Sequence, residues 1–364
     1  MNMSLLPNHQ KSENAANTDA ASAGVPHRSA AVTRRAVLAG ALAAPAVFRN
    51  GFAFAEEPLI IRVDFIPWGV HVALHLANAK GWFKHDGLSV DLQDGLGTLS
   101  TINLVAAGNA DIGLVQLGPM AIARAQGLPV VSFAGYMRKG DLAVLVDAKD
   151  GPKTAKDLAG KKIACFANSP WVPFIDNYLK RLGLERGEGP DKVNVVMVSA
   201  AAMMSTYASG GADGFMSVKE FGEPFVEDAR PAHSFLAADV GIVFPSFGLI
   251  STDATLAKRK EVLAKVAAIQ SRAWQYVFAD PAHLDEAVQA MIAARPDKQL
   301  NPKMLTHQAL ACKEFFDTPN TVGKPMGWQS DVDWKLAVAS MAEAGVVKPD
   351  IKIDESYTND LISS

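Results

Sequence analysis

From Leu59 onward, short runs rich in β-branched residues alternate with stretches whose apolar residues recur at helical spacing. Alternation of this kind is typical of βαβ units, which build a largely parallel sheet. The predicted strands are 59–65, 88–92, 110–115 and 130–136. The predicted helices between them are 71–80, 99–107 and 119–126. The pattern therefore predicts a first lobe of the α/β class.

A second unit of the same order begins near residue 146. Its predicted strands and helices lie at 161–165, 171–182, 193–198, 200–209 and 212–216. A strand at 247–252 then precedes helical patterns at 256–279, 282–294, 302–316 and 331–344. If the later segments return to the first lobe, the chain crosses twice between lobes. A cleft between the lobes that closes on a ligand by a hinge is then expected.

The predicted division of the chain follows from this order. Residues 56–145 and 245–345 form lobe 1, each lobe having a mainly parallel sheet flanked by helices. Residues 146–244 form lobe 2, and residues 346–364 form a C-terminal tail.

Residues 1–55 have the pattern of a signal peptide. Arg34 and Arg35 precede an Ala-rich apolar run that ends at Phe48 and is too short to span a bilayer. Adjacent arginines before a weakly hydrophobic run favour the twin-arginine route, and Ala53 to Ala55 supplies the small residues for cleavage after Ala55. We therefore expect export to the periplasm without membrane insertion of the mature chain. A cytosolic amphipathic helix that carries two arginines is the alternative.

Charge and cysteine content narrow the function further. The formal net charge is -3, and no stretch gathers Lys and Arg among aromatic residues, so a nucleic-acid partner is not expected. Cys165 and Cys312 lie far apart without CxxC spacing, so neither a metal site nor a cofactor is expected. A long-range disulfide and two buried free thiols both remain open.

Several residues stand where predicted strands end or helices begin, the edge at which open α/β sheets bind ligands. Trp68 can stack on a planar ring, and His71 can offer a donor or an acceptor beside that ring. Gly97 lets the backbone approach a ligand, and Thr98 begins a helix whose free N–H groups can meet an acceptor. Packing under the loop, helix capping and a tight turn without a ligand are the corresponding alternatives.

Other candidate ligand contacts share this kind of position. They are Gln116, Tyr136, Asn168, Ser169, Trp171, Glu220 and Phe247. Asn168 and Ser169 open a predicted helix, so plain N-capping is their alternative. Glu220 can accept hydrogen bonds from an amino-bearing ring, or it can be a solvated loop charge. Phe247 is expected to close the far wall of the cleft.

Four segments together carry a resemblance to a known family. They are Trp68 with His71, AKGWFKHDGLSV at 79–90, GLGT at 95–98 and AGNADIG at 107–113. With them the chain resembles the periplasmic binding proteins of nitrate, sulfonate and taurine importers, and more closely the branch similar to thiamine-pyrimidine synthase. The resemblance extends from about Leu59 to Gly345. It implies a type II periplasmic-binding-protein fold and a monomer that delivers a small ligand to the membrane permease of an ABC importer.

The resemblance also raises an enzyme of the thiamine-pyrimidine-synthase type, in which His71 would be the reactive residue. Those enzymes carry a close-set cysteine cluster for iron, which Cys165 and the distant Cys312 cannot supply. No GxSxG, HExxH or phosphate-loop motif offers another catalytic route. A binding protein without catalytic activity is therefore predicted. A ligand-sensing partner of a membrane receptor uses the same fold and stays open.

The ligand itself is predicted from the candidate residues. Two tryptophans, one His and one Glu fit a planar, amino-substituted heterocycle, such as a pyrimidine precursor of thiamine. Nitrate would call for several cationic donors. A sulfonate or an aromatic acid is the alternative, since Arg138 and Lys139 leave an anionic group on the ligand possible.

Overall fold

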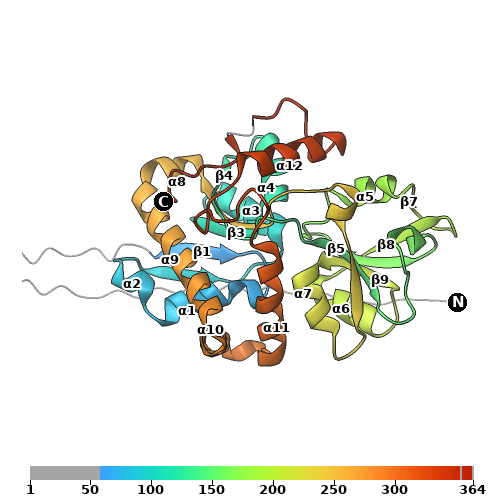
Figure 1. Ribbon diagram of the computed structural model, residues 1–364, viewed down its shortest axis with the longest axis horizontal. Coiled ribbons are helices and arrows are strands. Elements are labelled where there is room, and N and C mark those ends of the chain that lie inside the picture. Colours follow the sequence, from blue (N-terminus) through green and yellow to red (C-terminus); the bar gives the residue numbers. More distant parts are fainter. Residues whose placement is uncertain (1–57, 353–354, 363–364) are drawn as a thin grey trace, which may run out of the picture. The chain divides into compact units, whose positions relative to one another are not determined.

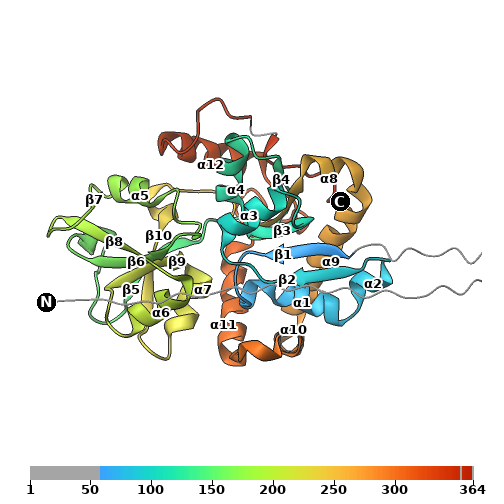
Figure 2. The ribbon, with the colours of Figure 1, turned by 180° about the vertical axis from the view of Figure 1, so that it is seen from behind.

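The computed structural model describes residues 58–352 and 355–362 of the chain. The predicted signal peptide, its twin-arginine motif and its cleavage site lie outside the described residues. Within the described part, two sheets flanked by helices form the centres of two lobes (Figures 1 and 2). The predicted two-lobed α/β class is confirmed.

The sheet of lobe 1 has five strands among the described residues, in the order β2-β1-β3-β11-β4. In that order they are Val90–Gln93, Leu59–Val63, Ile112–Gln116, Phe247–Thr252 and Val130–Gly135. Strand β1 pairs in parallel with β2 and β3, whereas β11 runs antiparallel to β3 and β4. The alternation in β1 points Leu59, Ile61 and Val63 into the core.

Nine helices of the described residues accompany this sheet. They are α1 Val72–Ala79, α2 Trp82–His85, α3 Thr98–Ala106, α4 Leu117–Ala125, α8 Asp253–Lys258, α9 Lys260–Ala279, α10 Pro281–Ala294, α11 Pro302–Cys312 and α12 Asp331–Glu343. Helix α10 begins where the sequence indicates, because the Asp280 side chain accepts a hydrogen bond from the Ala282 N–H and Pro281 takes the first position. Short 3-10 helices lie at Gly69–His71 and Lys313–Phe315.

The sheet of lobe 2 has the order β10-β5-β9-β6-β8-β7. Its strands are Ala232–Leu236, Leu142–Asp147, Gly214–Val218, Lys162–Phe166, Lys192–Val198 and Glu185–Arg186. Strands β9, β6, β8 and β7 pair in parallel, while β5 is antiparallel to both of its neighbours. The helices of this lobe are α5 Ile175–Arg181, α6 Ala200–Ala208 and α7 Lys219–Val226. In both sheets, therefore, antiparallel strands adjoin the chain crossings.

The chain crosses between the lobes after β4 and again before β11. All of β5 belongs to the second sheet, so lobe 2 begins before Leu142 and the boundary predicted at residue 145 cuts through one strand. Helix α11 of lobe 1 packs against α7 of lobe 2 (Figure 1). The Gln308 side chain contributes to this contact: its Nε2 donates to the Phe221 carbonyl, and its Oε1 accepts from the Gly69 N–H.

The C-terminal segment packs on lobe 1. The Thr358 N–H donates to the Ser132 carbonyl on β4 at 2.8 Å, and the Tyr357 ring stacks on Trp334 of α12. Leu361 is buried. The described part of the predicted tail, residues 346–352 and 355–362, thus ends as a component of the first lobe.

Candidate functional site

A pocket lies at the carboxyl ends of strands from both sheets. Its volume is about 410 Å³ with the open space at its mouth included, of which the centre of a water molecule can reach about 30 Å³. It is lined by Asp64, Phe65, Trp68, Gly97, Thr98, Phe166, Ser169, Pro170, Met203, Ser217, Val218, Phe221 and Phe247. Most of these residues are apolar, so the pocket favours a ligand with a large apolar surface.

The lobes touch each other across the mouth of this pocket. The Phe65 ring from lobe 1 stacks on the Phe166 ring from lobe 2, with 5.3 Å between centroids. A Cβ atom at Gly97 would lie 2.5 Å from the Cβ atom of Asn168, so the two loops are in direct contact. The structure is therefore the closed form of the two lobes.

Asp64 is the charged group of the pocket and follows the last residue of β1. The Nε2 atom of His71 lies 2.8 Å from its Oδ1 atom, and the Trp68 Nε1–H donates to the same oxygen at 3.3 Å. No described residue donates to the other oxygen, Oδ2. Because two buried donors hold one oxygen in place, the carboxylate is fixed with its second oxygen available to a ligand.

His71 does not line the pocket, contrary to its predicted place beside the ligand. Its ring is fully buried and lies behind Asp64. Its Nδ1 atom accepts from the Trp68 N–H at 3.3 Å, which leaves Nε2 as the donor to Asp64. His71 thus positions the carboxylate.

Trp68 lines the pocket and is 2% exposed. Its indole packs edge-on against the rings of His71, Phe221 and Phe247, with centroid separations of 5.4–5.6 Å. Phe247, the first residue of β11, also lines the pocket. The aromatic side chains of this wall therefore support one another by edge-on packing.

Gly97 and Thr98 both line the pocket. Gly97 is the N-cap of α3 with a φ of +124°, which favours glycine, and Thr98 is the first residue of the helix. The Thr98 side chain is fully buried, and its Oγ1 has no hydrogen-bond partner among the described residues. A buried hydroxyl at a helix start, without a partner, is suited to a polar atom of a ligand.

The loop after β6 contributes Ser169 to the pocket, whereas Asn168 is exposed and meets Gly97. Trp171 does not line the pocket. It is fully buried, its Nε1–H donates to the Ser217 carbonyl at 2.7 Å, and its ring packs edge-on against Tyr178. Trp171 thus supports the strand end that carries Ser217, and the aromatic lining of the pocket besides Trp68 consists of phenylalanines.

Three further predicted residues lie outside the pocket lining. The Tyr136 hydroxyl donates to the Ala267 carbonyl on α9 at 2.9 Å. Gln116 donates from Nε2 to both carboxyl oxygens of Asp141, at 2.9 Å each. Glu220 is not on a loop: it is the second residue of α7 and is fully buried beside Asp141.

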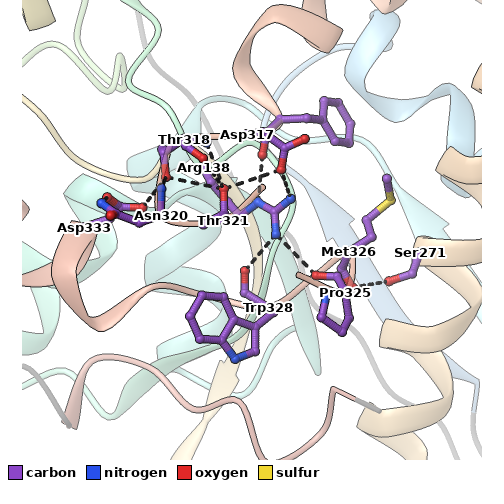
Figure 3. A network of polar contacts seen from close by, with 11 residues as sticks. Arg138, Ser271, Asp317, Thr318, Asn320, Thr321, Pro325, Met326, Trp328 and Asp333 are labelled. Atoms are coloured by element: carbon purple, nitrogen blue, oxygen red, sulfur yellow. Dashed lines mark hydrogen bonds and ion pairs between the residues drawn. The ribbon is translucent and has the colours of Figure 1, made fainter. Parts of the chain in front are cut away.

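Arg138 is likewise committed to protein groups (Figure 3). Its guanidinium donates to the carbonyls of Phe316, Pro325 and Trp328 and pairs with the carboxylate of Asp317. The side chain is 5% exposed. Arg138 therefore anchors the chain after β4 to the 316–328 loop of lobe 1 and is not placed to meet an anionic ligand.

The cysteines are separate in the structure. Cys165 on β6 and Cys312 at the end of α11 are free, buried thiols. Across residues 58–352 and 355–362, no group of three or more His, Cys, Asp or Glu side chains is arranged to hold a metal ion. The same part of the chain contains no helix of the length and apolar character that crossing a membrane requires.

Asp64 is missing from the predicted site residues, although it occupies the same strand end as Trp68. The predicted strand 59–65 includes Asp64 and so hides it, whereas the observed strand ends at Val63 and puts the Asp64 carboxylate at the ligand edge of the sheet. Phe65, Phe166, Met203 and Phe221 carry no signal in the sequence, since apolar residues near strand ends are as common in cores as in pockets.

Comparison with known proteins shows where this fold and pocket belong. A family model described as "NMT1/THI5 like" matches residues 68–284. A 4-amino-5-hydroxymethyl-2-methylpyrimidine phosphate synthase of Saccharomyces cerevisiae is 26% identical over 85% of this chain and 89% of its own. A formylaminopyrimidine-binding protein of Halalkalibacterium halodurans is 24% identical over 78% of this chain and 84% of its own.

Solved structures agree on the fold. The alkanesulfonate-binding protein SsuA from Xanthomonas axonopodis pv. citri has a TM-score of 0.61 at 17% identity, over 84% of this chain and 99% of its own. The nitrate-binding protein NrtA from Synechocystis has a TM-score of 0.60 at 12% identity, over 84% of this chain and 87% of its own. The predicted periplasmic-binding-protein fold is thereby confirmed, and the chain belongs to the NMT1/THI5-like family.

Proposed function

We propose that this protein is the solute-binding component of an ABC importer, exported to the periplasm, and that it closes on a planar, amino-substituted heterocycle such as a pyrimidine precursor of thiamine. The ligand is released unchanged to a membrane permease. The fold and the family membership support the binding role.

One observation carries the choice of ligand. Among the described residues that line the pocket, Asp64 is the single charged side chain, and the others are mainly aromatic or aliphatic. A carboxylate accepts hydrogen bonds and disfavours anions in a buried site. An amino group or a protonated ring nitrogen meets the Asp64 Oδ2 atom, and an acceptor on the ligand meets the Thr98 hydroxyl.

Relatives with two different kinds of name support a pyrimidine ligand. One is named for binding a formylaminopyrimidine, and others are named as synthases of a pyrimidine phosphate. Two structural neighbours are named for binding alkanesulfonates and nitrate. Either of these anions would place a second negative charge against the Asp64 carboxylate in this pocket.

A synthase is the second candidate, because the yeast relatives that match most of the chain carry that name. In such an enzyme His71 would act on a substrate. Its ring, however, is fully buried behind Asp64 and both ring nitrogens have protein partners. The geometry therefore favours the binding role.

Calorimetry of the purified protein with 4-amino-5-hydroxymethyl-2-methylpyrimidine, MOPS and nitrate tests the ligand class. We expect the pyrimidine to bind and the two anions not to bind. Asp64→Asn should weaken binding by about 10- to 100-fold, since a hydrogen bond to a charged group contributes about 1.5–3 kcal/mol. Asp91→Asn removes an exposed carboxylate on the neighbouring strand β2 and should leave the affinity unchanged.

Tighter binding of either anion than of the pyrimidine would contradict the proposed ligand class. Mass spectrometry of the small molecules released from the protein separates the two candidate functions. Because the yeast relatives are named for making a pyrimidine phosphate, the appearance of a pyrimidine phosphate that was not added supports a synthase, and release of only the added pyrimidine supports a binding protein.

A further inference from the structure

A buried pair of carboxyl groups lies where the two lobes join. Asp141 immediately precedes β5, and Glu220 is the second residue of α7; both side chains are fully buried. The Asp141 carboxylate accepts two hydrogen bonds from Gln116 and one from the Ser246 hydroxyl. Among the described residues, no amide, hydroxyl or cationic group donates a hydrogen bond to either carboxyl oxygen of Glu220.

This arrangement requires a proton. Two ionised carboxylates in contact inside a protein repel each other, and an ionised buried group without donors costs several kcal/mol. A proton on Glu220 removes both penalties, because the resulting O–H donates to Asp141. Asp141 is then the ionised carboxyl group of the pair, since Gln116 and Ser246 already donate to it.

The charged and titratable groups around the pair do not replace this proton. Asp64, which follows β1, and Cys312, at the end of α11, are the titratable groups near Glu220 on those two elements, and neither carries a positive charge. Lys219, the neighbour on α7, points outward and pairs with Glu314 at 2.9 Å. Burial, followed by the charge of Asp141, raises the pKa of Glu220 well above its ordinary value, and burial also raises the pKa of Asp141.

The four side chains come from both sides of the crossing. Gln116 ends β3 of lobe 1, and Ser246 precedes β11 of the same sheet. Asp141 and Glu220 move with lobe 2, because the Lys219 N–H donates to the Asp141 carbonyl at 3.0 Å. The two neutral donors thus come from lobe 1 and the two carboxyl groups from lobe 2, so a movement that parted these elements would leave the carboxyl pair without its donors.

We propose that Asp141 and Glu220 form a proton-binding site that is occupied in the closed form, so that closure of the lobes takes up a proton. Its link to ligand binding rests on the proposed function, whereas the site itself does not. A group whose pKa is raised in the closed, folded state stabilises that state fully below its pKa in the unfolded chain, about 4.3 for Glu. That stabilisation is lost as the pH rises through the raised pKa of the closed form.

Urea unfolding of the full chain between pH 5 and pH 9, without a ligand, tests the site. Between the pKa of an unfolded Glu, about 4.3, and the raised pKa of the pair, the folded-to-unfolded ratio of the wild type should fall by up to about tenfold per pH unit relative to Glu220→Gln, and above the raised pKa the difference should level off. The glutamine amide donates to Asp141 as the protonated carboxyl does, but does not titrate. Glu223→Gln, on the same helix and half-buried, is the matched control and should keep the wild-type pH dependence.

Equal pH dependence of the wild type and Glu220→Gln would overturn the proton site. Asp141→Asn leaves Glu220 buried but removes the neighbouring charge and supplies an amide donor, so it should weaken the pH dependence without abolishing it; this variant keeps the test decisive if Glu220→Gln fails to fold. Small-angle scattering of the same samples tests the link to opening. The radius of gyration of the wild type should increase toward alkaline pH and that of Glu220→Gln should not; identical radii would overturn the link. Neither readout uses a ligand, so failure of the proposed function leaves both results valid.

Discussion

His71 Nε2 lies 2.8 Å from Asp64 Oδ1, and the two side chains are almost completely removed from solvent. Their contact fixes the one carboxylate of the pocket in the direction of a ligand. The residues predicted as ligand contacts therefore fall into two groups. Some line the pocket, and others, such as His71, position the side chains that line it.

Replacing His71 tests its positioning role. His71→Phe removes the donor to Asp64 and should lower the free energy of unfolding by about 1–3 kcal/mol, because a buried carboxylate oxygen loses a partner. His71→Gln retains an N–H donor of similar reach, so its free energy of unfolding should fall by less than that of His71→Phe. Urea titration at pH 7 measures both. Equal losses in the two variants would show that ring packing, and not the hydrogen bond, is what His71 contributes.

Thr98 and Thr101 form a matched pair on α3. The Thr98 hydroxyl is buried without a partner among the described residues, whereas the Thr101 hydroxyl donates to the Val63 carbonyl at 3.0 Å. Thr98→Val should therefore keep or raise the stability of the protein and weaken ligand binding. Thr101→Val should lower the free energy of unfolding by about 1 kcal/mol and leave the affinity unchanged. Thermal unfolding and calorimetry with the pyrimidine measure the two effects, and loss of stability in Thr98→Val would contradict the assignment.

The contact between Gly97 and Asn168 predicts a variant that cannot close. A Cβ atom at Gly97 would lie 2.5–2.6 Å from Asn168 atoms, and the φ of +124° disfavours any other residue. Gly97→Ala should increase the radius of gyration in the presence of the pyrimidine and weaken its binding at least tenfold. Gly81→Ala also changes a glycine of positive φ, but no atom lies within 4 Å of its added Cβ. That control should bind as the wild type does.

Arg138 should behave as a structural residue. Arg138→Met leaves the carbonyls of Phe316, Pro325 and Trp328 without their donor and should cost about 1–3 kcal/mol of stability. Lys139→Met, at the partly exposed neighbouring position, should change the stability by less than about 1 kcal/mol. Urea unfolding distinguishes them. A stability loss in Lys139→Met that matched that of Arg138→Met would contradict the distinct role of the buried guanidinium.

The sequence predicts most strands and long helices because their signals are local. Strand β8 is predicted at 193–198 and found at Lys192–Val198, and α10 has both its Asp cap and its proline. Helix α7 is missed, because Gly222 and Pro224 lie inside it and its stability comes from packing against α11. Its burial explains why Glu220 is a core group and not a loop charge.

The pocket is predicted only in part, for a different reason. Strand ends identify Trp68, Gly97, Thr98, Ser169 and Phe247, which share the edge of the two sheets. Side-chain direction decides the rest, and it depends on neighbours distant in the chain: Trp171 turns to the Ser217 carbonyl, and Tyr136 turns to Ala267 on α9. No pattern within a single strand or helix records such partners.

The position of β11 between β3 and β4 affects how the protein can be assembled as it is synthesised. Lobe 2 is built from one continuous segment and can fold as soon as that segment is complete. Until β11 follows, the first sheet keeps two unpaired edges, which are templates for pairing with other chains. Aggregation of newly made protein should therefore begin at β3 and β4.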